Sequence, residues 1–330
     1  MESSAQLAAM GYQVTLIEKE GKLGGHVDQW DFLFPNHRPA REIVDSLKQR
    51  LISKIDLKLG TEVKSVVRNN NHFSIQLSNS EVLYGDALLL STGFDLFEAG
   101  KKEEYGHGIY NNVITAAELE QVFRENNLRL RLSGNTRRIG IVHCVGSRDE
   151  KVGNEYCSKV CCVTGVKQAI RLREALPEYE VFNFYMDLRM FGRYFEDLYR
   201  EAQEKWGVQF LRGRVSEASE DISGNVVVKV EDTLAGRPMK MSVDMLVLLT
   251  GFVTSKGTKK IGNMLDLEFG NDRFLKPADE HLFRNHSNKD GIFVAGACTG
   301  PRSISETITD ARAAALEIAA FFRNTEGRHE

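Results

Sequence analysis

The feature that most constrains this chain is a set of four cysteines in one short stretch, Cys144, Cys157, Cys161 and Cys162. Their spacing is C-x12-C-x3-C-C, and Cys298 is the only cysteine outside the set. Four thiols drawn together in a cysteine-poor chain indicate a ligand set rather than a disulfide framework. Four thiolates hold a [4Fe–4S] cluster or a zinc ion. Adjacent cysteines are awkward as two ligands of one small ion, so the spacing favours iron–sulfur, with zinc or redox-active thiols as the alternatives.

Composition limits the remaining choices. A chain of 330 residues is long enough for about two domains. The formal charge of -3 and the pI near 6.3 give no electrostatic reason to expect nucleic acid. No apolar run approaches the ~18–20 residues that a membrane helix needs. We therefore expect a cytoplasmic, reducing location, which suits thiolate ligands.

The first residues have the pattern of the second half of a β-α-β dinucleotide-binding unit. A helix is expected over residues 2–10, Gly11 ends it, and a strand over residues 12–18 ends at Glu18. An acid at the end of that strand accepts hydrogen bonds from an adenosine ribose; the alternative is a solvated carboxylate. The first strand and its Gly-rich turn belong before Met1, so the pattern predicts a sequence truncated at its N-terminus.

Three later turns are typical of flavoproteins with two dinucleotide-binding domains. Gly24-Gly25 allows the backbone to approach a pyrophosphate closely. A buried strand over residues 87–93 ends at Thr92-Gly93, and a strand over 291–297 leads to a helix over 305–322. In such flavoproteins an acid usually occupies the position of Ala297. The residues expected to bind the cofactor are Glu18, Gly24, Gly25, His26, Val63, Thr92, Gly93, Gly296, Ala297 and Ile304, with a polar loop residue as the alternative for His26.

The middle of the chain resembles a second nucleotide domain whose Gly-rich turn has been replaced by cysteines. A strand over 138–142 is followed by HCVGSRD, which keeps a single glycine. The pattern then predicts helices over 163–176 and 194–206, with strands over 180–186, 208–212, 226–230 and 245–251 completing one doubly wound sheet. Residues 220–240 are expected to form a polar surface hairpin. Arg189, Arg193 and Arg200 are expected to form a basic helix face, with the remnant of a lost phosphate site as the alternative.

The predicted fold class is therefore α/β, a two-dinucleotide-binding-domain flavoprotein. We expect a FAD-binding domain whose first part is 1–106 and whose second part is 254–330. An inserted NAD-type domain over 107–253 would carry the iron–sulfur ligands.

The segments HCVGSRD…YCSKVCC, FYMDLRMFG and GIFVAGACTGP together resemble the A subunit of heterodisulfide reductase and its relatives. The resemblance covers nearly the whole chain. It implies a thioredoxin-reductase-like architecture, FAD, and a [4Fe–4S] cluster held by Cys144, Cys157, Cys161 and Cys162. It also implies that Lys167, five residues after the last cysteine, approaches the flavin N5; an ordinary helix-surface lysine is the alternative.

Two departures refine this resemblance. Within the printed residues we expect neither the N-terminal cluster domain nor the C-terminal ferredoxin modules of full members of this family, and the segment WDFLFPNHRPAREI has no cysteine. This shorter form is similar to the A subunit of the quinone-interacting membrane-bound oxidoreductase complex, which implies electron transfer between the quinone pool and adenylylsulfate reductase in sulfur metabolism. The implied partners are a homologous iron–sulfur/flavin subunit, a membrane haem subunit that meets quinone, and adenylylsulfate reductase, so the protein would associate with the inner face of the membrane through them.

Other functions stay open on the sequence. They are a soluble sulfur-oxidising member of the same family, a stand-alone NAD(P)H-dependent disulfide reductase, and a zinc or scaffold module. The disulfide reductase is disfavoured because it needs a second Gly-rich turn after Val142 and a C-x-x-C pair, neither of which is present. No Ser-His-Asp or paired-carboxylate pattern appears, so we expect substrate chemistry to take place on another subunit.

Overall fold

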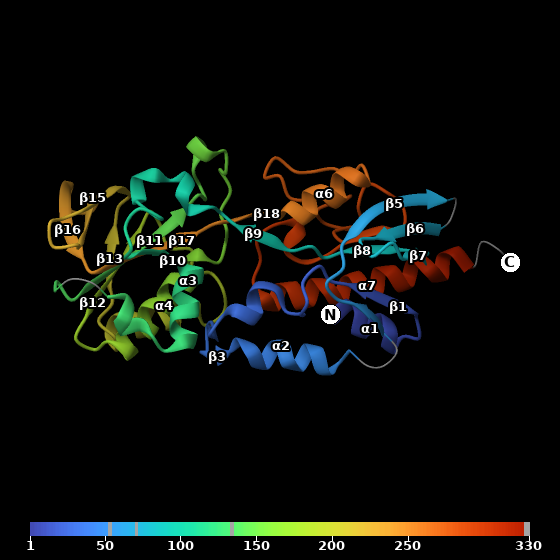
Figure 1. The fold of residues 1–330 in the computed structure, drawn as a ribbon, viewed down its shortest axis with the longest axis horizontal. Coiled ribbons are helices and arrows are strands. Elements are labelled where there is room, and N and C mark those ends of the chain that lie inside the picture. The colour runs from blue at the N-terminus through green and yellow to red at the C-terminus, as the bar shows by residue number, and fades with distance from the viewer. Residues whose placement is uncertain (52–54, 70–71, 133–134, 327–330) are drawn as a thin grey trace. The chain divides into compact units, whose positions relative to one another are not determined.

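The computed structural model describes residues 1–51, 55–69, 72–132 and 135–326 (Figure 1). Contacts divide the chain into two compact units. Unit 1 comprises Met1–Asp28, Glu42–Asp95 and Val253–Glu330, and unit 2 comprises Gln29–Arg41 and Leu96–Phe252. These units are defined by contacts between residues. The FAD-binding and NAD-type domains, with expected boundaries after residues 106 and 253, stay a prediction.

Unit 1 is built on two pairs of parallel strands. One pair is β1 (Val14–Ile17) with β4 (Ile55–Lys58), and the other is β8 (Leu88–Leu90) with β19 (Ile292–Val294). The helices of this unit are α1 (Glu2–Ala9), α2 (Ala40–Gln49, whose first two residues belong to unit 2), α6 (Lys256–Met264) and α7 (Ile304–Glu326). Helix α1 packs on α7, and its small residues Ala5 and Ala8 are buried.

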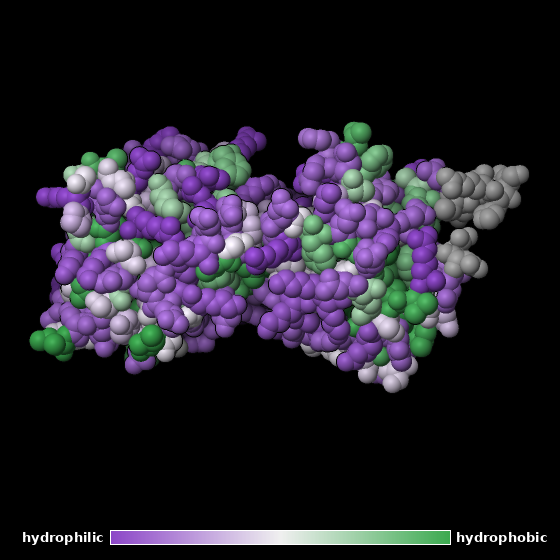
Figure 2. All heavy atoms as spheres, turned by 90° about the horizontal axis from the view of Figure 1, so that it is seen from above, coloured by the Kyte–Doolittle hydropathy of each residue, from purple (hydrophilic) through white to green (hydrophobic). Residues whose placement is uncertain are grey.

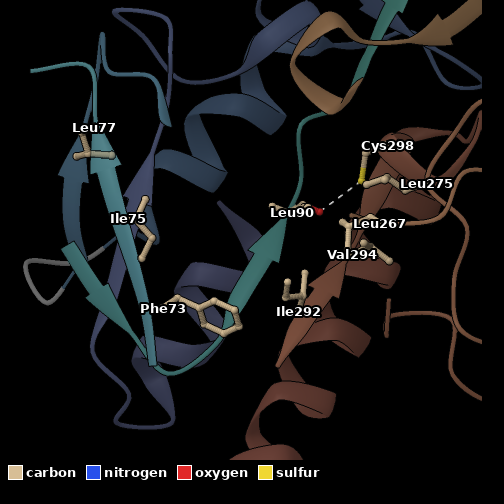
Figure 3. Packing of buried hydrophobic residues seen from close by; sticks show 9 residues of the cluster. All are labelled: Phe73, Ile75, Leu77, Leu90, Leu267, Leu275, Ile292, Val294 and Cys298. Atoms are coloured by element: carbon tan, nitrogen blue, oxygen red, sulfur yellow. Dashed lines mark hydrogen bonds between the residues drawn. The ribbon is translucent and has the colours of Figure 1, made fainter. Parts of the chain in front are cut away.

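A three-stranded antiparallel sheet completes unit 1 and packs beside the second parallel pair. Its strands are β5 (Val63–Asn69), β6 (His72–Leu77) and β7 (Val82–Gly85). Phe73, Ile75 and Leu77 alternate along β6 and form one core with β8 and β19 (Figure 3). Cys298 lies in this core, with its thiol 3.3 Å from the carbonyl oxygen of Leu90, so it is the small buried residue of an apolar cluster.

Unit 2 contains a five-stranded, all-parallel sheet in the order β10-β17-β11-β12-β13. The strands are β10 (Val113–Thr115), β11 (Arg138–Val145), β12 (Glu180–Tyr185), β13 (Gln209–Arg212) and β17 (Met245–Thr250). The helices are α3 (Ala116–Glu125), α4 (Cys161–Ala175) and α5 (Phe195–Glu204), of which α4 and α5 connect successive strands. The predicted doubly wound order β-α-β-α-β is confirmed.

The structure corrects one part of the sequence-based prediction and refines another. Residues 226–230 do not join the parallel sheet, because they form part of β15 (Val226–Asp232) in a separate antiparallel sheet with β14 (Val215–Glu220) and β16 (Arg237–Val243). The hairpin predicted within residues 220–240 is present, because β15 pairs with β16, but it is not wholly polar, since Val226, Val228 and Val230 are buried. Alternation of apolar and polar residues indicates a strand but does not identify its partners.

The remaining strands are short. They are β2 (Phe32–Leu33), β3 (Arg38–Pro39), β9 (Phe94–Leu96) and β18 (Phe252–Thr254). Within the described residues, none of the helices combines the length and the apolar character that crossing a membrane demands. Figure 2 shows a face on which hydrophilic side chains predominate and hydrophobic ones gather in small groups.

Candidate functional site

Cys144 lies at the carboxyl end of β11, where the ladder between β11 and β17 is irregular. The register shifts between Val142 and Val145, and Cys144 has a left-handed φ of 59°. A bulge of this kind turns a side chain out of the alternation of the strand. The single glycine retained after the cysteine, Gly146, has a φ of 70°, and a Cβ there would overlap the ring of Phe97. Strand β11 therefore runs three residues further than predicted. It is followed by a tightly packed turn at Gly146.

Cys157 is held by hydrogen bonds between two buried serines. Ser158 donates its backbone N–H to Ser147 Oγ at 3.0 Å, and the two hydroxyl oxygens are also 3.0 Å apart. Ser147 donates to the carbonyl oxygen of Tyr156 at 3.0 Å. This network joins the segment after Cys144 to the segment around Cys157. The backbone N–H of Lys159 points at Cys157 Sγ, at 3.2 Å.

Cys161 and Cys162 are the first two residues of α4, so the helix starts two residues earlier than predicted. The first N–H groups of a helix lack intrahelical partners and favour negative charge, which suits thiolates. Cys162 Sγ accepts a hydrogen bond from the backbone N–H of Arg189 and lies 3.7 Å from the carbonyl oxygen of Asp187. The loop after β12 thus meets the start of α4.

The four thiols come together at the carboxyl edge of the parallel sheet. Burial raises the pKa of Cys144 to about 12, with Cys162 and Cys157 acting in the same direction and Arg148 opposing them. Burial raises the pKa of Cys161 well above its ordinary value, and the other three thiols add to this effect. Each thiol therefore lies within electrostatic reach of its neighbours. All are free cysteines, and among the described residues no group of three or more His, Cys, Asp or Glu is arranged to hold a metal ion.

The chemistry of this donor set fits an iron–sulfur cluster. Buried thiols that raise one another's pKa are stabilised as thiolates when a cationic centre lies among them. Backbone N–H groups directed at Cys157 and Cys162 supply the N–H···S hydrogen bonds that tune such clusters. The carboxyl edge of a parallel sheet is where α/β proteins bind ligands.

His143, which the sequence interpretation did not single out, lies beside this set. Its Nε2 is 2.8 Å from Asn183 Oδ1 on β12, and burial lowers its pKa to about 4, so the ring is neutral. Helix α4 crosses it closely: a Cβ at Gly165 would lie 2.8 Å from His143 Nε2 and 2.6 Å from Leu249. His143 and Gly165 thus set how closely the helix that carries Cys161 and Cys162 packs on the sheet.

The predicted cofactor residues of unit 1 follow strand ends. Glu18 comes directly after β1, and its Oε1 accepts the backbone N–H of Glu20 at 3.0 Å. Gly24 has a φ of 124°, and a Cβ there would lie 2.8 Å from Asp28 Cβ, so this turn requires glycine. His26 stacks on Phe94 with ring centroids 4.8 Å apart. Its ring is packed rather than lying in a polar loop, although this does not test whether it meets a cofactor.

The other predicted residues lie at the ends of β8 and β19 and at the start of β5 and α7. Thr92 Oγ1 is 2.6 Å from Thr258 Oγ1, and Gly93 follows with a φ of 66°. Val63 is the first residue of β5 and Ile304 the first of α7. Whether these residues bind a cofactor stays a prediction.

An acid reaches the turn at Gly296 and Ala297 from a place that the sequence interpretation missed. Asp310, in the second turn of α7, accepts the backbone N–H of Gly296 at 2.7 Å and forms an ion pair with Arg302. Ala297 itself is buried. An acid in the second turn of α7 was the signal that the sequence offered. Side chains on a helix point back toward its N-terminus, so Asp310 can reach the turn that precedes α7.

Lys167 is not a surface lysine. It is 5% exposed, and its Nζ donates to Glu120 Oε1 at 2.5 Å and to the carbonyl oxygen of Phe32 at 2.9 Å. Asp31 donates its backbone N–H to the other oxygen of Glu120 at 3.0 Å. Arg171 stacks on the ring of Phe32, with Cζ 5.0 Å from its centroid. The segment Gln29–Arg41, which follows the Gly-Gly turn, is thereby anchored to α3 and α4 of unit 2.

The fold agrees with solved structures. The chain matches T. acidophilum thioredoxin reductase with a TM-score of 0.64 at 15% identity, covering 97% of this chain and 93% of that one. Lactococcus lactis thioredoxin reductase matches with a TM-score of 0.63 at 14% identity, covering 97% and 94%. The fold is thus that of thioredoxin reductases, with two dinucleotide-binding-type domains, and at these identities the likeness shows the fold alone.

Sequence comparison identifies the family. The chain is 39% identical over 239 residues to the A subunit of the H(2)/formate:CoB-CoM heterodisulfide,ferredoxin reductase of Methanococcus maripaludis. It is 38% identical over 239 residues to the iron-sulfur A subunit of the CoB--CoM heterodisulfide reductase of Methanocaldococcus jannaschii. Each match covers 70% of this chain and 36% of the relative, so the chain spans just over a third of the length of these relatives. No protein-family model matches it. Over the matched stretch the chain belongs to the family of heterodisulfide reductase A subunits.

Proposed function

We propose that this protein is an electron-transfer subunit that holds FAD in unit 1 and a [4Fe–4S] cluster in unit 2. The observation that carries the proposal is the gathering of Cys144, Cys157, Cys161 and Cys162 at the carboxyl edge of a nucleotide-type sheet. The name of one relative, which calls it an iron-sulfur subunit, supports the cluster, and the thioredoxin-reductase-like fold supports FAD.

The residues of the chain have distinct tasks in this proposal. The four thiolates hold the cluster, and the N–H groups of Lys159 and Arg189 stabilise their charge. Glu18 binds the ribose, while the Gly24-Gly25 turn and the start of α7 accommodate the phosphates. When bound, a flavin would accept electrons in pairs or pass them singly, and a cubane cluster would carry one electron at a time, so the two together would convert between the two modes. A role for Lys167 at the flavin stays a prediction; its Nζ is bonded to Glu120 and to the carbonyl oxygen of Phe32.

The names of the relatives support a proposal about the partners of this chain. Those relatives are subunits of heterodisulfide reductases, so we propose that this chain also works with other subunits. The finer proposal is a complex that contains a homologous iron–sulfur/flavin subunit, together with a membrane haem subunit, and links the quinone pool to adenylylsulfate reductase. The cysteine-free segment 30–43 supports this finer proposal.

The test is anaerobic reconstitution of the protein with iron and sulfide, followed by iron analysis and a visible spectrum. A cluster absorbs as a broad shoulder near ~400 nm beside the flavin bands. Cys162→Ser should lose most of the iron, because a cubane needs all its thiolates or a substitute.

Cys298→Ser is the matched control, since its thiol is fully buried in the core of unit 1. It should keep the iron of the parent protein. Full iron in Cys162→Ser would refute the ligand assignment. Stoichiometric zinc without iron would support the zinc alternative, and rapid NADH-dependent disulfide reduction by the protein alone would support a stand-alone reductase.

A further inference from the structure

An ion pair between Arg148 and Asp187 joins two of the segments around the cysteines. Arg148 lies between Cys144 and Cys157 in the sequence, and its Nη1 donates to Asp187 Oδ1 at 2.5 Å. Asp187 lies in the loop after β12, and its carbonyl oxygen is 3.7 Å from Cys162 Sγ. The pair therefore links the segment between two of the proposed cluster ligands to the residue beside a third.

The turn that carries Arg148 fixes its backbone. Arg148 has a left-handed φ of 54°, which persists in a residue other than glycine only when its surroundings demand it. Its N–H donates to the carbonyl oxygen of Tyr156 at 3.0 Å. The side chain of Arg148 is 24% exposed and that of Asp187 is 44% exposed. The arginine is thus the more enclosed partner, so water and salt screen its charge less.

The charge of Arg148 reaches three of the four thiols. Burial raises the pKa of Cys144 and of Cys162, and the charge of Arg148 opposes both rises. Burial also opposes the charged form of Arg148, but its hydrogen bond to Asp187 acts the other way, and the pKa of Arg148 is raised. The thiols of Cys144 and Cys157 add to that rise. Asp187 acts on Cys144 and Cys162 with the opposite sign to Arg148.

Arg189 is a second cation at this ion pair, with its Nε 3.5 Å from the same carboxylate oxygen. Its backbone N–H is hydrogen-bonded to Cys162 Sγ. The sequence predicted a helix face formed by Arg189, Arg193 and Arg200, but the first two precede α5 and only Arg200 lies on it. The loop after β12 thus gives a backbone donor to the thiols, and Arg148 brings them the charge of a side chain.

Reduction of an iron–sulfur cluster adds one electron, and therefore one negative charge, without making or breaking a bond. Positive charge nearby stabilises the reduced form and raises the reduction potential, and negative charge lowers it. We propose that Arg148 raises the reduction potential of the [4Fe–4S] cluster and that Asp187 opposes it, so that the pair sets the potential at which this subunit exchanges an electron. The proposal rests on the proposed function, because it needs a cluster among the four thiols.

The experiment is a redox titration of the reconstituted full chain, with dithionite as the electron donor, soluble mediators, and the EPR signal of the reduced cluster as the readout. Arg148→Gln should lower the equilibrium constant for cluster reduction by about tenfold, which is ~59 mV for a one-electron couple. Asp187→Asn should shift the potential in the opposite direction, because it removes the opposing charge. Arg148→Lys keeps the positive charge and should keep the potential of the parent protein.

Iron is measured on the same preparations and should stay at the content of the parent protein. If Arg148→Gln loses its iron, the sign of the shift in Asp187→Asn decides. Arg138→Gln is the matched control, because Arg138 and Glu180 form an ion pair at the opposite, amino ends of β11 and β12. This control should leave the potential unchanged.

A purely structural link would give a different pattern, since either variant breaks the pair. Shifts of the same sign in Arg148→Gln and Asp187→Asn would therefore overturn the proposal, as would an equal shift in Arg138→Gln. A parent protein that binds no iron would refute the proposed function itself. Full iron in Arg148→Gln with the potential of the parent would refute this inference alone.

Discussion

Several residues around the cysteines hold backbone conformations that side chains other than glycine rarely adopt. Cys144, Arg148 and Lys159 have φ values of 59°, 54° and 63°. Each such residue costs about 1–3 kcal/mol, which the surrounding hydrogen bonds must offset. Arg148, for example, donates its N–H to the carbonyl oxygen of Tyr156 at 3.0 Å. Strain at positions flanking the proposed ligands agrees with the cluster that we propose there.

A buried carboxylate, Asp149, supports this loop. Its side chain is 3% exposed and accepts from Lys102 Nζ at 2.7 Å and from the backbone N–H of Lys151 at 3.1 Å. Burial alone would raise the pKa of Asp149, but the hydrogen bond from Lys102 and the charges of Lys102 and Arg214 outweigh it and lower that pKa. A carboxyl group whose pKa is lowered by folding stabilises the folded protein at pH values above the ordinary Asp pKa. This stability is lost as the pH falls through the pKa of the folded state.

We therefore predict that Asp149→Asn lowers the free energy of unfolding at pH 7 by about 1–3 kcal/mol. The difference between the variant and the parent should shrink as the pH falls below about 4, the ordinary Asp pKa. Urea unfolding at a series of pH values measures both effects. Glu150→Gln changes an exposed neighbour and should alter neither. Unfolding free energies that stay separated by the same amount down to a pH of about 2 would contradict the assignment.

At the scale of the element, helix α4 combines two functions. Its first turn carries Cys161 and Cys162, and its second and third turns carry Lys167, Gln168 and Arg171 toward α3 and residues 31–32. Ten of its residues are buried, so side chains facing several directions are covered. Helix α3 begins with a capping box in which Thr115 and Glu118 bond reciprocally, which places Glu120 for the ion pair. The two helices thus form a rigid support behind the cysteines.

Breaking the buried pair should be costly. Lys167→Met leaves Glu120 without its cation, so we predict a loss of about 3–5 kcal/mol in the free energy of unfolding. Combining it with Glu120→Leu should recover much of that loss, because two apolar residues can replace a buried ion pair at little net cost. Denaturant unfolding of the two single variants and the double variant measures the coupling. Additive losses, with a changed flavin potential in Lys167→Met, would favour a role of Lys167 at the flavin instead.

At the scale of the whole molecule, the two proposed cofactor sites rest on separate cores. In unit 1, Phe293 packs with Leu7, Ala315 and Ile318. In unit 2, the central strands of the parallel sheet are buried along their lengths, with Leu246 fully covered. All four clustered cysteines lie in unit 2, and the predicted cofactor-binding residues other than Lys167 lie in unit 1.

We predict that Phe293→Ala costs unit 1 about 3–5 kcal/mol and lowers flavin retention, while the iron content of the reconstituted protein stays near that of the parent. Leu246→Ala is the converse variant and should reduce iron before it reduces flavin. Flavin and iron are measured on the same preparations after mild heating. Loss of both cofactors together in each variant would show that the units unfold as one.

Local patterns in the sequence were sufficient for the parts of this protein that depend on neighbours along the chain. The helix over residues 2–9 and the β11–α4–β12–α5–β13 order were predicted, because periodicity is a property of short segments. The membership of the heterodisulfide reductase family was predicted from a resemblance to its sequence segments. The ligand role of the four cysteines was also proposed from spacing alone.

Only the tertiary structure determined the contacts between residues that are far apart in sequence. Spacing cannot reveal that Lys167 is buried against Glu120, that Asp310 supplies the acid at Gly296, or that β15 belongs to a separate sheet. It also cannot bring the loop after β12 over Cys162. Each of these contacts forms because parallel strands place their carboxyl ends, and the loops that follow them, at one edge of a sheet, or because a buried charge must find a partner wherever the packing provides one.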